Sequence, residues 1–287
     1  MINGFTIDLE DWFCSHNLNG NIKYEDWDKL PGRIIGPTMC ILQLLSKYQT
    51  KATFFVLGWI ADRYPDLIRT IVAEGHEIAS HGYSHRLLTD MTREDFKDDL
   101  GKSVSAIYNS CRIKPKGFRA PAFTVVKSTL WALDVVKELG FVYDSSIYPT
   151  SVHPDYGIGD APLSIFSPQK NLIEIPLSCA SFGRRNIPCS GGAYLRFLPY
   201  PLYKKLVSNV INSGRNFIFY IHPWEIDTEM PQIKLPLLKH FRHYTNISST
   251  LGKIERLLQD FEFTSLERIL KENNRAIPEL ILTSSYE

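Results

Sequence analysis

Short apolar runs alternate with amphipathic segments through the first half of the chain. The runs are brief and rich in β-branched or aromatic residues, which is typical of buried strands. They cover residues 5–9, 52–57, 77–80, 117–119 and 141–144. Between them, apolar residues spaced three or four apart predict helices over 37–48, 65–74, 92–108 and 128–139. Repeated strand–helix units with short connections indicate parallel strands, so we expect an α/β fold.

The pattern becomes less regular from about residue 150. The segment 149–168 is rich in Pro, Gly and Asp, and it predicts a long loop. Further strands are expected over 172–175 and 216–221, with helices over 200–212 and 248–260 and a short apolar run and a helix after them. We find no internal repeat and no low-complexity linker. We therefore expect one domain over residues 1–287.

Composition narrows the class of protein. The chain has 287 residues, with 32 Lys and Arg against 31 Asp and Glu, which argues against a nucleic acid or an anionic membrane held by bulk charge. It has no run of eighteen apolar residues, so no membrane-spanning helix is expected. The five cysteines form no Cys-x-x-Cys pair, and free thiols in a reducing cytoplasm are the plain interpretation. They are Cys14, Cys40, Cys111, Cys179 and Cys189.

Two histidines, His81 and His85, follow the apolar run 77–80. If the segment forms a helical turn, the spacing of four residues places both imidazoles on one face. Two neutral imidazoles can hold a borderline metal such as Zn²⁺. The spacing alone is more often a surface pair, so the metal interpretation depends on the rest of the chain.

Charged residues also stand at the ends of other strand-like runs. Asp8, Glu10 and Asp11 close the first run, and Arg119, Asp144 and His222 close later ones. The carboxyl ends of barrel strands converge on one mouth, where active sites are built. Asp8 and Glu10 are two residues apart, so on a strand they face the same side. One carboxylate could bind a metal while the other takes a proton from its water.

These motifs, in this order, resemble the polysaccharide deacetylase family, also called the NodB-homology or carbohydrate esterase 4 family. The matching segments are TIDLEDWF at 6–13, GHEIASHGYSH at 75–85, FRAP at 118–121, YDSS at 143–146 and HPWEID at 222–227. Together with GGAYLR at 191–196 and FRHY at 241–244, they look most like the subfamily linked to exopolysaccharide gene clusters. The resemblance implies a distorted (β/α)₇ barrel.

The resemblance also implies roles for single residues. Asp8 would be the general base, held by Arg119, and His222 the general acid, oriented by Asp144. Glu10, His81 and His85 would bind the metal, with Asp11 as second choice for the carboxylate. A peptide N–H of Ala122 or Phe123 would stabilise the oxyanion. Tyr194, Arg196, Trp224 and the pair Gly191–Gly192 could contact the sugar, or could equally serve packing.

We therefore expect a metal-dependent hydrolase that removes the N-acetyl group of an amino sugar in a polysaccharide or its precursor. One divalent metal is expected per chain: zinc by preference, with Co²⁺, Ni²⁺ or Fe²⁺ suited to similar ligands. The rival functions are a deformylase or ureide hydrolase on the same scaffold, and an inactive carbohydrate-binding protein. Because Asp8 lies so close to the N-terminus, no cleavable leader fits before it, and a cytoplasmic protein is expected. The oligomeric state is left open.

Overall fold

A computed structural model describes residues 2–18, 20–152, 156–183, 185–273 and 276–282. Part of the loop predicted over 149–168, residues 153–155, lies outside the described residues. In the described part of the chain, no helix combines the length and the apolar character needed to cross a bilayer.

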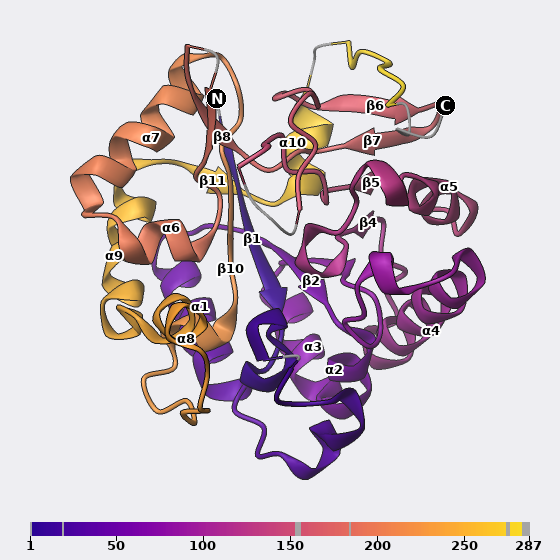
Figure 1. The fold of residues 1–287 in the computed structure, drawn as a ribbon, viewed down its shortest axis with the longest axis vertical. Helices are drawn as coiled ribbons and strands as arrows, with labels where there is room; N and C mark the ends of the chain where they lie inside the picture. The colour runs from indigo at the N-terminus through magenta and orange to yellow at the C-terminus, as the bar shows by residue number, and fades with distance from the viewer. Residues whose placement is uncertain (1, 19, 153–155, 184, 274–275, 283–287) are drawn as a thin grey trace.

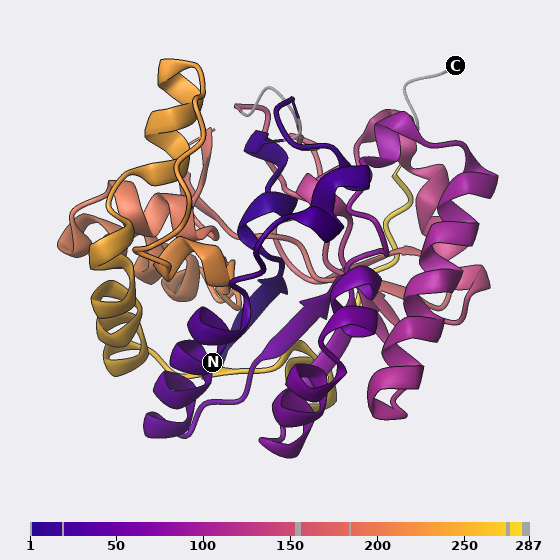
Figure 2. The ribbon, with the colours of Figure 1, turned by 90° about the horizontal axis from the view of Figure 1, so that it is seen from below.

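A curled, mainly parallel sheet forms the centre of the molecule (Figures 1 and 2). Seven parallel strands follow one another in the order β10-β1-β2-β3-β4-β5-β7. Their bounds are Ile218–Ile221, Asn3–Leu9, Thr53–Val56, Glu77–Ser80, Gly117–Phe118, Tyr143–Asp144 and Leu172–Glu174. The antiparallel β6 (Phe166–Gln169) extends the sheet at one edge, and β11 (Phe263–Thr264) adds to β1. The expected distorted α/β barrel is confirmed in this form.

Helices cover the outside of the sheet (Figure 2). The α-helices are α1 Ile35–Lys47, α2 Gly58–Arg63, α3 Pro65–Ala73, α4 Arg93–Cys111, α5 Trp131–Glu138, α6 Gly192–Phe197, α7 Tyr200–Asn212, α8 Leu237–Tyr244, α9 Ile247–Asp260 and α10 Leu266–Glu272. The six helices predicted by range correspond to α1, α3, α4, α5, α7 and α9, with ends shifted by up to three residues. The loop prediction over 149–168 is wrong at its end, where β6 begins.

The main core joins the two halves of the sequence. Phe5 of β1 packs edge-on against Phe219 of β10 and Phe263 of β11, with ring centroids 5.1 and 5.6 Å apart. The same core includes Ile7, Phe217 and Leu257, all of them fully buried. A separate hairpin, β8 (Cys179–Phe182) with β9 (Arg185–Pro188), lies beside α7 and was not predicted. All five cysteines are free thiols, as expected.

Candidate active site

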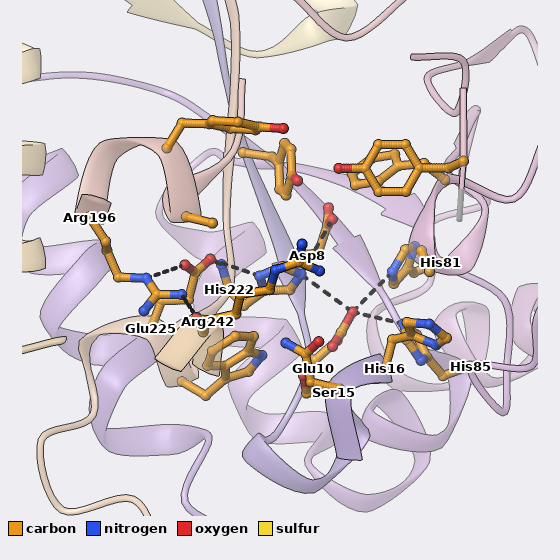
Figure 3. A pocket seen from close by; sticks show the side chains of 18 of the residues that line it. Asp8, Glu10, Ser15, His16, His81, His85, Arg196, His222, Glu225 and Arg242 are labelled. Carbon is orange, nitrogen blue, oxygen red and sulfur yellow. Dashed lines mark hydrogen bonds and ion pairs between the residues drawn. The ribbon is translucent and has the colours of Figure 1, made fainter. Parts of the chain in front are cut away.

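Most of the predicted site residues, among them Asp8, Glu10, His81, His85 and His222, gather around one pocket at the carboxyl ends of the parallel strands (Figure 3). Asp8 lies on β1, Glu10 directly after it, His81 directly after β3 and His222 directly after β10. The pocket has a volume of about 290 Å³, close to the lower end for small-molecule sites and suited to a sugar unit. The topology of the parallel sheet thus brings residues more than two hundred positions apart to one mouth.

Glu10, His81 and His85 form a compact buried cluster. The Nε2 atoms of His81 and His85 lie 3.2 and 3.0 Å from the same oxygen, Oε1 of Glu10. Burial by itself would raise the pKa of Glu10, but the neighbouring imidazoles of His85, His222 and His81 outweigh burial and hold it well below its usual range. The carboxyl is therefore kept as an anion in a buried place, which is the state a metal ligand needs.

The segment that carries the two histidines is not the helical turn that their spacing suggested. His81 directly follows the extended β3 strand, and His85 lies in a loop with φ = 54°. The loop is held by α4, where Asp99 accepts hydrogen bonds from the backbone N–H groups of Tyr83 and Ser84 at 2.7 and 3.2 Å. The imidazoles converge because the loop reverses, and this geometry could not be deduced from a spacing of four residues.

The ring of His81 is oriented by the backbone. Its Nδ1 donates to the carbonyl oxygen of Arg119 at 2.7 Å, which leaves Nε2 as the atom that faces Glu10. His85 also turns Nε2 toward Glu10, while its buried Nδ1 has no described partner. The ligand atoms of the three residues lie within 4.8 Å of one another. A buried carboxylate facing two imidazole nitrogens is a donor set that fits a divalent transition metal.

Asp8 is held by a buried ion pair. Nη1 of Arg119 donates to Oδ1 of Asp8 at 2.7 Å, and both side chains are almost completely buried. Arg119 is fixed in turn by the hydroxyls of Thr6 and Ser145 and by the carbonyl of Ser145. The second oxygen of Asp8, Oδ2, faces His222, whose Nε2 lies 3.9 Å away. One oxygen of Asp8 is therefore anchored, and the other is directed at the pocket.

Glu225, rather than Asp144, is the carboxylate in contact with His222. Nδ1 of His222 donates to Oε1 of Glu225 at 2.8 Å, and Oε2 of Glu225 accepts from Nε of Arg196 at 2.8 Å (Figure 3). Burial would raise the pKa of Glu225, but Arg196 and then His222 outweigh it and lower the value. Sequence reasoning missed this role of Glu225. The signal was its place three residues after His222, where Pro223 begins a short 3₁₀ helix.

Asp144 lies deeper, against another acid. It stands opposite Glu174 in the register of β5 and β7, and both side chains are fully buried. Asp144 accepts from the hydroxyl of Ser146 at 2.6 Å, and Glu174 accepts from the N–H of Ile147 at 2.9 Å. Burial and the neighbouring Asp144 raise the pKa of Glu174 well above its usual range, which favours its protonated form. The expected contact of Asp144 with His222 is not among the described contacts, and Glu225 occupies that place.

Asp11, the alternative metal ligand, is engaged in hydrogen bonds with backbone N–H groups. Its oxygens accept hydrogen bonds from the N–H groups of Trp12, Arg33 and Ile34 at 2.8 to 3.2 Å. Burial raises the pKa of Asp11 to about 6, against these hydrogen bonds. Asp11 thus caps the turn after β1 and fixes the segment before α1. The cluster that could hold a metal among the described residues contains Glu10 and not Asp11.

The peptide groups proposed for the oxyanion follow Pro121. Ala122 and Phe123 have φ values of 49° and 56°, a left-handed backbone that costs non-glycine residues about 1 kcal/mol or more each. The N–H of Phe123 donates to the carbonyl of Ala120 at 3.1 Å. The N–H of Ala122, which lies in the pocket wall, is not among the described hydrogen bonds. Of the two predicted donors, Ala122 is therefore the one left for a substrate oxygen.

Aromatic side chains also line the pocket, but some of them are engaged in packing. Trp224 is only 5% exposed and stacks on His222, with ring centroids 5.0 Å apart. Arg196 is buried and forms an ion pair with Glu225, which favours the packing alternative for this residue. Tyr194 remains partly exposed in the wall. A side chain at Gly192 would come within 2.6 Å of Glu225, so this glycine makes room for Glu225 rather than for a loop reaching a ligand.

This fold and site define an α/β domain with a buried carboxylate–histidine cluster at the carboxyl ends of its parallel strands. Residues 28–143 match the polysaccharide deacetylase family, and residues 145–271 match a domain of unknown function (DUF3473). Within residues 28–143 the chain therefore contains a polysaccharide deacetylase domain, in agreement with the resemblance that the motifs indicated. The first match includes His81, His85 and Arg119 but neither Asp8 nor Glu10, and His222 falls in the second.

Relatives and a solved structure agree with this assignment. A peptidoglycan deacetylase of Helicobacter pylori is 33% identical over 122 residues, which are 42% of this chain and 41% of that protein. A peptidoglycan-N-acetylglucosamine deacetylase of Bacillus cereus is 32% identical over 95 residues, 33% of this chain and 34% of that protein. A chitooligosaccharide deacetylase of a Bradyrhizobium species is 34% identical over 97 residues, 33% of this chain and 42% of that protein.

These alignments span about a third to two fifths of the curated relatives. For the fold, a crystal structure from Mycobacterium smegmatis, of a protein assigned to the polysaccharide deacetylases, covers 98% of this chain and 94% of its own. It superposes with a TM-score of 0.61 at 19% identity. This likeness extends over both matched regions, so the two regions share one known architecture.

Proposed function

We propose that this protein is a metal-dependent hydrolase that removes the N-acetyl group from an amino sugar. The observation that carries the proposal is the placement of three units around one pocket: the Glu10–His81–His85 cluster, the Asp8–Arg119 pair and the His222–Glu225 pair. These units supply a metal site, a base and an acid, which hydrolysis of an amide requires. The relatives named as deacetylases of peptidoglycan N-acetylglucosamine and of chitooligosaccharides support the choice of substrate.

Glu10, His81 and His85 would hold one divalent metal, with zinc preferred by the ligand set. Such an ion supplies Lewis-acid polarisation of the acyl oxygen and lowers the pKa of water. Oδ2 of Asp8 takes the proton of the attacking water, because Arg119 keeps the other oxygen anchored. The N–H of Ala122 donates to the acyl oxygen as negative charge develops on it.

His222 protonates the departing amine. Its Nδ1–H is bound to Glu225, so the proton on Nε2 faces the pocket, on the side of Asp8 and Glu10. An amine is a poor leaving group and must be protonated before it departs. We further propose that the sugar belongs to a polysaccharide or its precursor, as the exopolysaccharide-type motifs suggest. The cytoplasmic location stays a prediction from sequence.

Metal analysis combined with activity tests this function. The purified protein should bind about one transition metal per chain, and His81→Ala and His85→Ala should lose it. Asp8→Asn should keep the metal but lose about 10²–10⁴-fold in kcat, the usual weight of a general base. His240→Ala, which removes a histidine of α8 outside the cluster, is the control and should keep both.

The substrate panel separates the alternatives. Wild-type enzyme is assayed on N-acetyl and N-formyl glucosamine and on a ureide, before and after chelation and after return of Zn²⁺. We expect hydrolysis of the N-acetyl sugar, its loss on chelation and its recovery with Zn²⁺. Preference for the formyl sugar or the ureide would replace deacetylation by the rival reaction. Full metal retention in both histidine variants would refute the site.

A further inference from the structure

Arg242 brings an unpaired positive charge to the pocket. It lies near the C-terminal end of α8 and lines the same pocket as Asp8 and His222 (Figure 3). Of the two arginines in the wall, Arg196 is paired with Glu225, whereas no ion pair or side-chain hydrogen bond joins Arg242 to any residue that the structure describes. A guanidinium without a protein partner in a pocket wall is available to a ligand.

The acids of the pocket are already engaged. Asp8 is paired with Arg119, Glu225 with Arg196 and His222, and Glu10 with the two imidazoles of the metal cluster. None of these carboxylates is described within ion-pair distance of Arg242. The charge of Arg242 is therefore not needed to balance the catalytic groups, and its role has to be sought in the substrate.

The backbone at Arg242 is fixed even though its side chain is free. Arg196 donates to the carbonyl oxygens of Arg242, His243 and Thr245 at 2.9, 3.3 and 2.7 Å. Arg196 itself is 1% exposed. Because the anchoring uses carbonyl groups, a substitution of the Arg242 side chain leaves these hydrogen bonds intact. The guanidinium therefore projects from a rigid support, which lowers the entropy lost when it binds a ligand.

The positive charge of Arg242 also acts on Tyr194 of α6, which lines the same pocket. Burial raises the pKa of Tyr194 to about 12, and the positive charge of Arg242 is one of the weaker influences that lower it. Arg242 and Tyr194 both line the pocket, on helices α8 and α6, which contribute no residue to the Glu10–His81–His85 cluster. A substituent of the sugar other than the reacting amide would lie beside them.

We propose that Arg242 binds an oxyanion, a carboxylate or a phosphate, on the amino-sugar substrate, which makes the substrate an acidic one. This inference rests on the proposed function for the identity of the sugar. A guanidinium presents paired N–H donors that match the two oxygens of a carboxylate or phosphate, and such charge-assisted bonds are stronger than bonds to sugar hydroxyls. The enzyme would therefore discriminate acidic from neutral N-acetyl sugars at this position.

Kinetics with three substrates test the proposal. They are the methyl glycosides of N-acetylglucosamine and of N-acetylglucosaminuronic acid, and N-acetylglucosamine 1-phosphate. We expect Arg242→Gln to lower kcat/KM about 10–100-fold for an acidic sugar and less than about 3-fold for the neutral one. Arg242→Lys should restore part of the loss, since it keeps the charge without the paired donors. Lys239→Gln, an exposed cation of α8 outside the pocket wall, is the matched control and should change neither.

The two acidic substrates distinguish the source of the charge. A loss confined to the uronate assigns the subsite to a sugar carboxylate, and a loss confined to the 1-phosphate assigns it to a phosphate-linked sugar. Equal losses on neutral and acidic sugars, or no loss on either acidic sugar, would overturn the proposal.

A binding measurement keeps this inference separate from the proposed function. The Asp8→Asn protein, with and without Arg242→Gln, is titrated with the same three sugars by calorimetry. Tighter binding of an acidic sugar that depends on Arg242 supports the subsite even if no sugar is hydrolysed, in which case only the proposed reaction fails. Hydrolysis of N-acetyl sugars without any such dependence refutes the subsite alone. Absence of Arg242-dependent binding overturns the subsite whether or not hydrolysis occurs.

Discussion

His222 holds its proton because carboxylates surround a ring that is only 18% exposed. Burial lowers the pKa of His222, but Glu10, Glu225 and Asp8 together outweigh it and raise the value to about 9. Glu10 belongs to the Glu10–His81–His85 cluster, so a cation bound there would share its charge. Glu225 is different, because it contacts the far nitrogen of the ring and stays outside that cluster. Removal of the Glu225 carboxylate therefore tests what raises the pKa of His222.

Glu225→Gln should lower the pKa of His222 by about 1–2 units, because a charge-assisted hydrogen bond is worth about 1.5–3 kcal/mol. A general acid works only while protonated. The alkaline limb of the profile of kcat against pH should therefore move to lower pH in the variant. Activity would then be lost earlier as the pH rises and would be least affected at the acidic end. Steady-state kinetics between pH 5 and 10, with metal content checked, measures the shift.

Glu229→Gln provides the control, because Glu229 is exposed and is paired with Arg33 rather than with His222. It should leave the alkaline limb in place. A uniform loss of activity in Glu225→Gln at every pH, with no displacement of the limb, would mean that Glu225 only supports Arg196. Thermal unfolding of the same variant reports that structural part, since Arg196 would be left buried without its carboxylate.

The positions of single site residues could be predicted from the sequence where the order of the strands alone determines them. Asp8, His81 and His222 lie in or directly after strand-like runs, so topology carries them to one mouth. Glu225 and Glu174 were not recognised, because their partners are chosen by tertiary packing. Glu174 looks like part of an ordinary strand until the register of β5 and β7 places it opposite Asp144. The same packing explains why Asp144 pairs with an acid instead of reaching His222.

At the level of elements, helix α4 supports the loop that carries the two histidines. Asp99 of α4 accepts from the backbone of Tyr83 and Ser84 and from the hydroxyl of Ser84. A Cβ added at Gly82, where φ is 75°, would lie 3.1 Å from the same carboxylate. The loop is thus shaped by one side chain of a helix that contributes no group to the metal cluster.

Asp99→Ala should weaken metal binding about 10–100-fold without unfolding the protein, which is the usual effect of removing a group that orients metal ligands. The reason is that His85 would no longer be held at the position set by the loop. Competition for Zn²⁺ with a chromophoric chelator measures the affinity. Asp98→Ala, an exposed acid next to it on α4, should leave the affinity unchanged. Equal affinity in both variants would show that the loop holds its shape without Asp99.

The helices and strands could be predicted from the sequence to very different degrees. Helices such as α4 and α7 were predicted because their signals are local: α4 begins with a capping box at Thr92, and α7 covers the predicted range 200–212. The short α2, α6 and α8 were missed, since helices of six to eight residues are marginal without tertiary contacts. The β8–β9 hairpin was not predicted because its two strands lack a clear alternation of buried and exposed residues.

For the whole molecule, the boundary between the two matched families lies inside the central sheet. It falls at β5, whose two residues pair with β4 on one side and β7 on the other. β1 is flanked by β2 from the first region and by β10 and β11 from the second. The candidate site is divided in the same way, since His81 and His85 come from the first region, His222 and Glu225 come from the second, and Glu10 precedes both.

We therefore predict that the chain unfolds as one cooperative unit. Tryptophan fluorescence and far-UV circular dichroism should give coincident urea transitions in the metal-free protein. A fragment of residues 1–144 should show no cooperative transition, because Phe5 would lose its contacts with Phe219 and Phe263. Deleting one such buried ring costs about 3–5 kcal/mol, and a whole domain has only about 5–15 kcal/mol to lose. Two separate transitions in the full chain, or a fragment that melts cooperatively, would divide the molecule into independent domains.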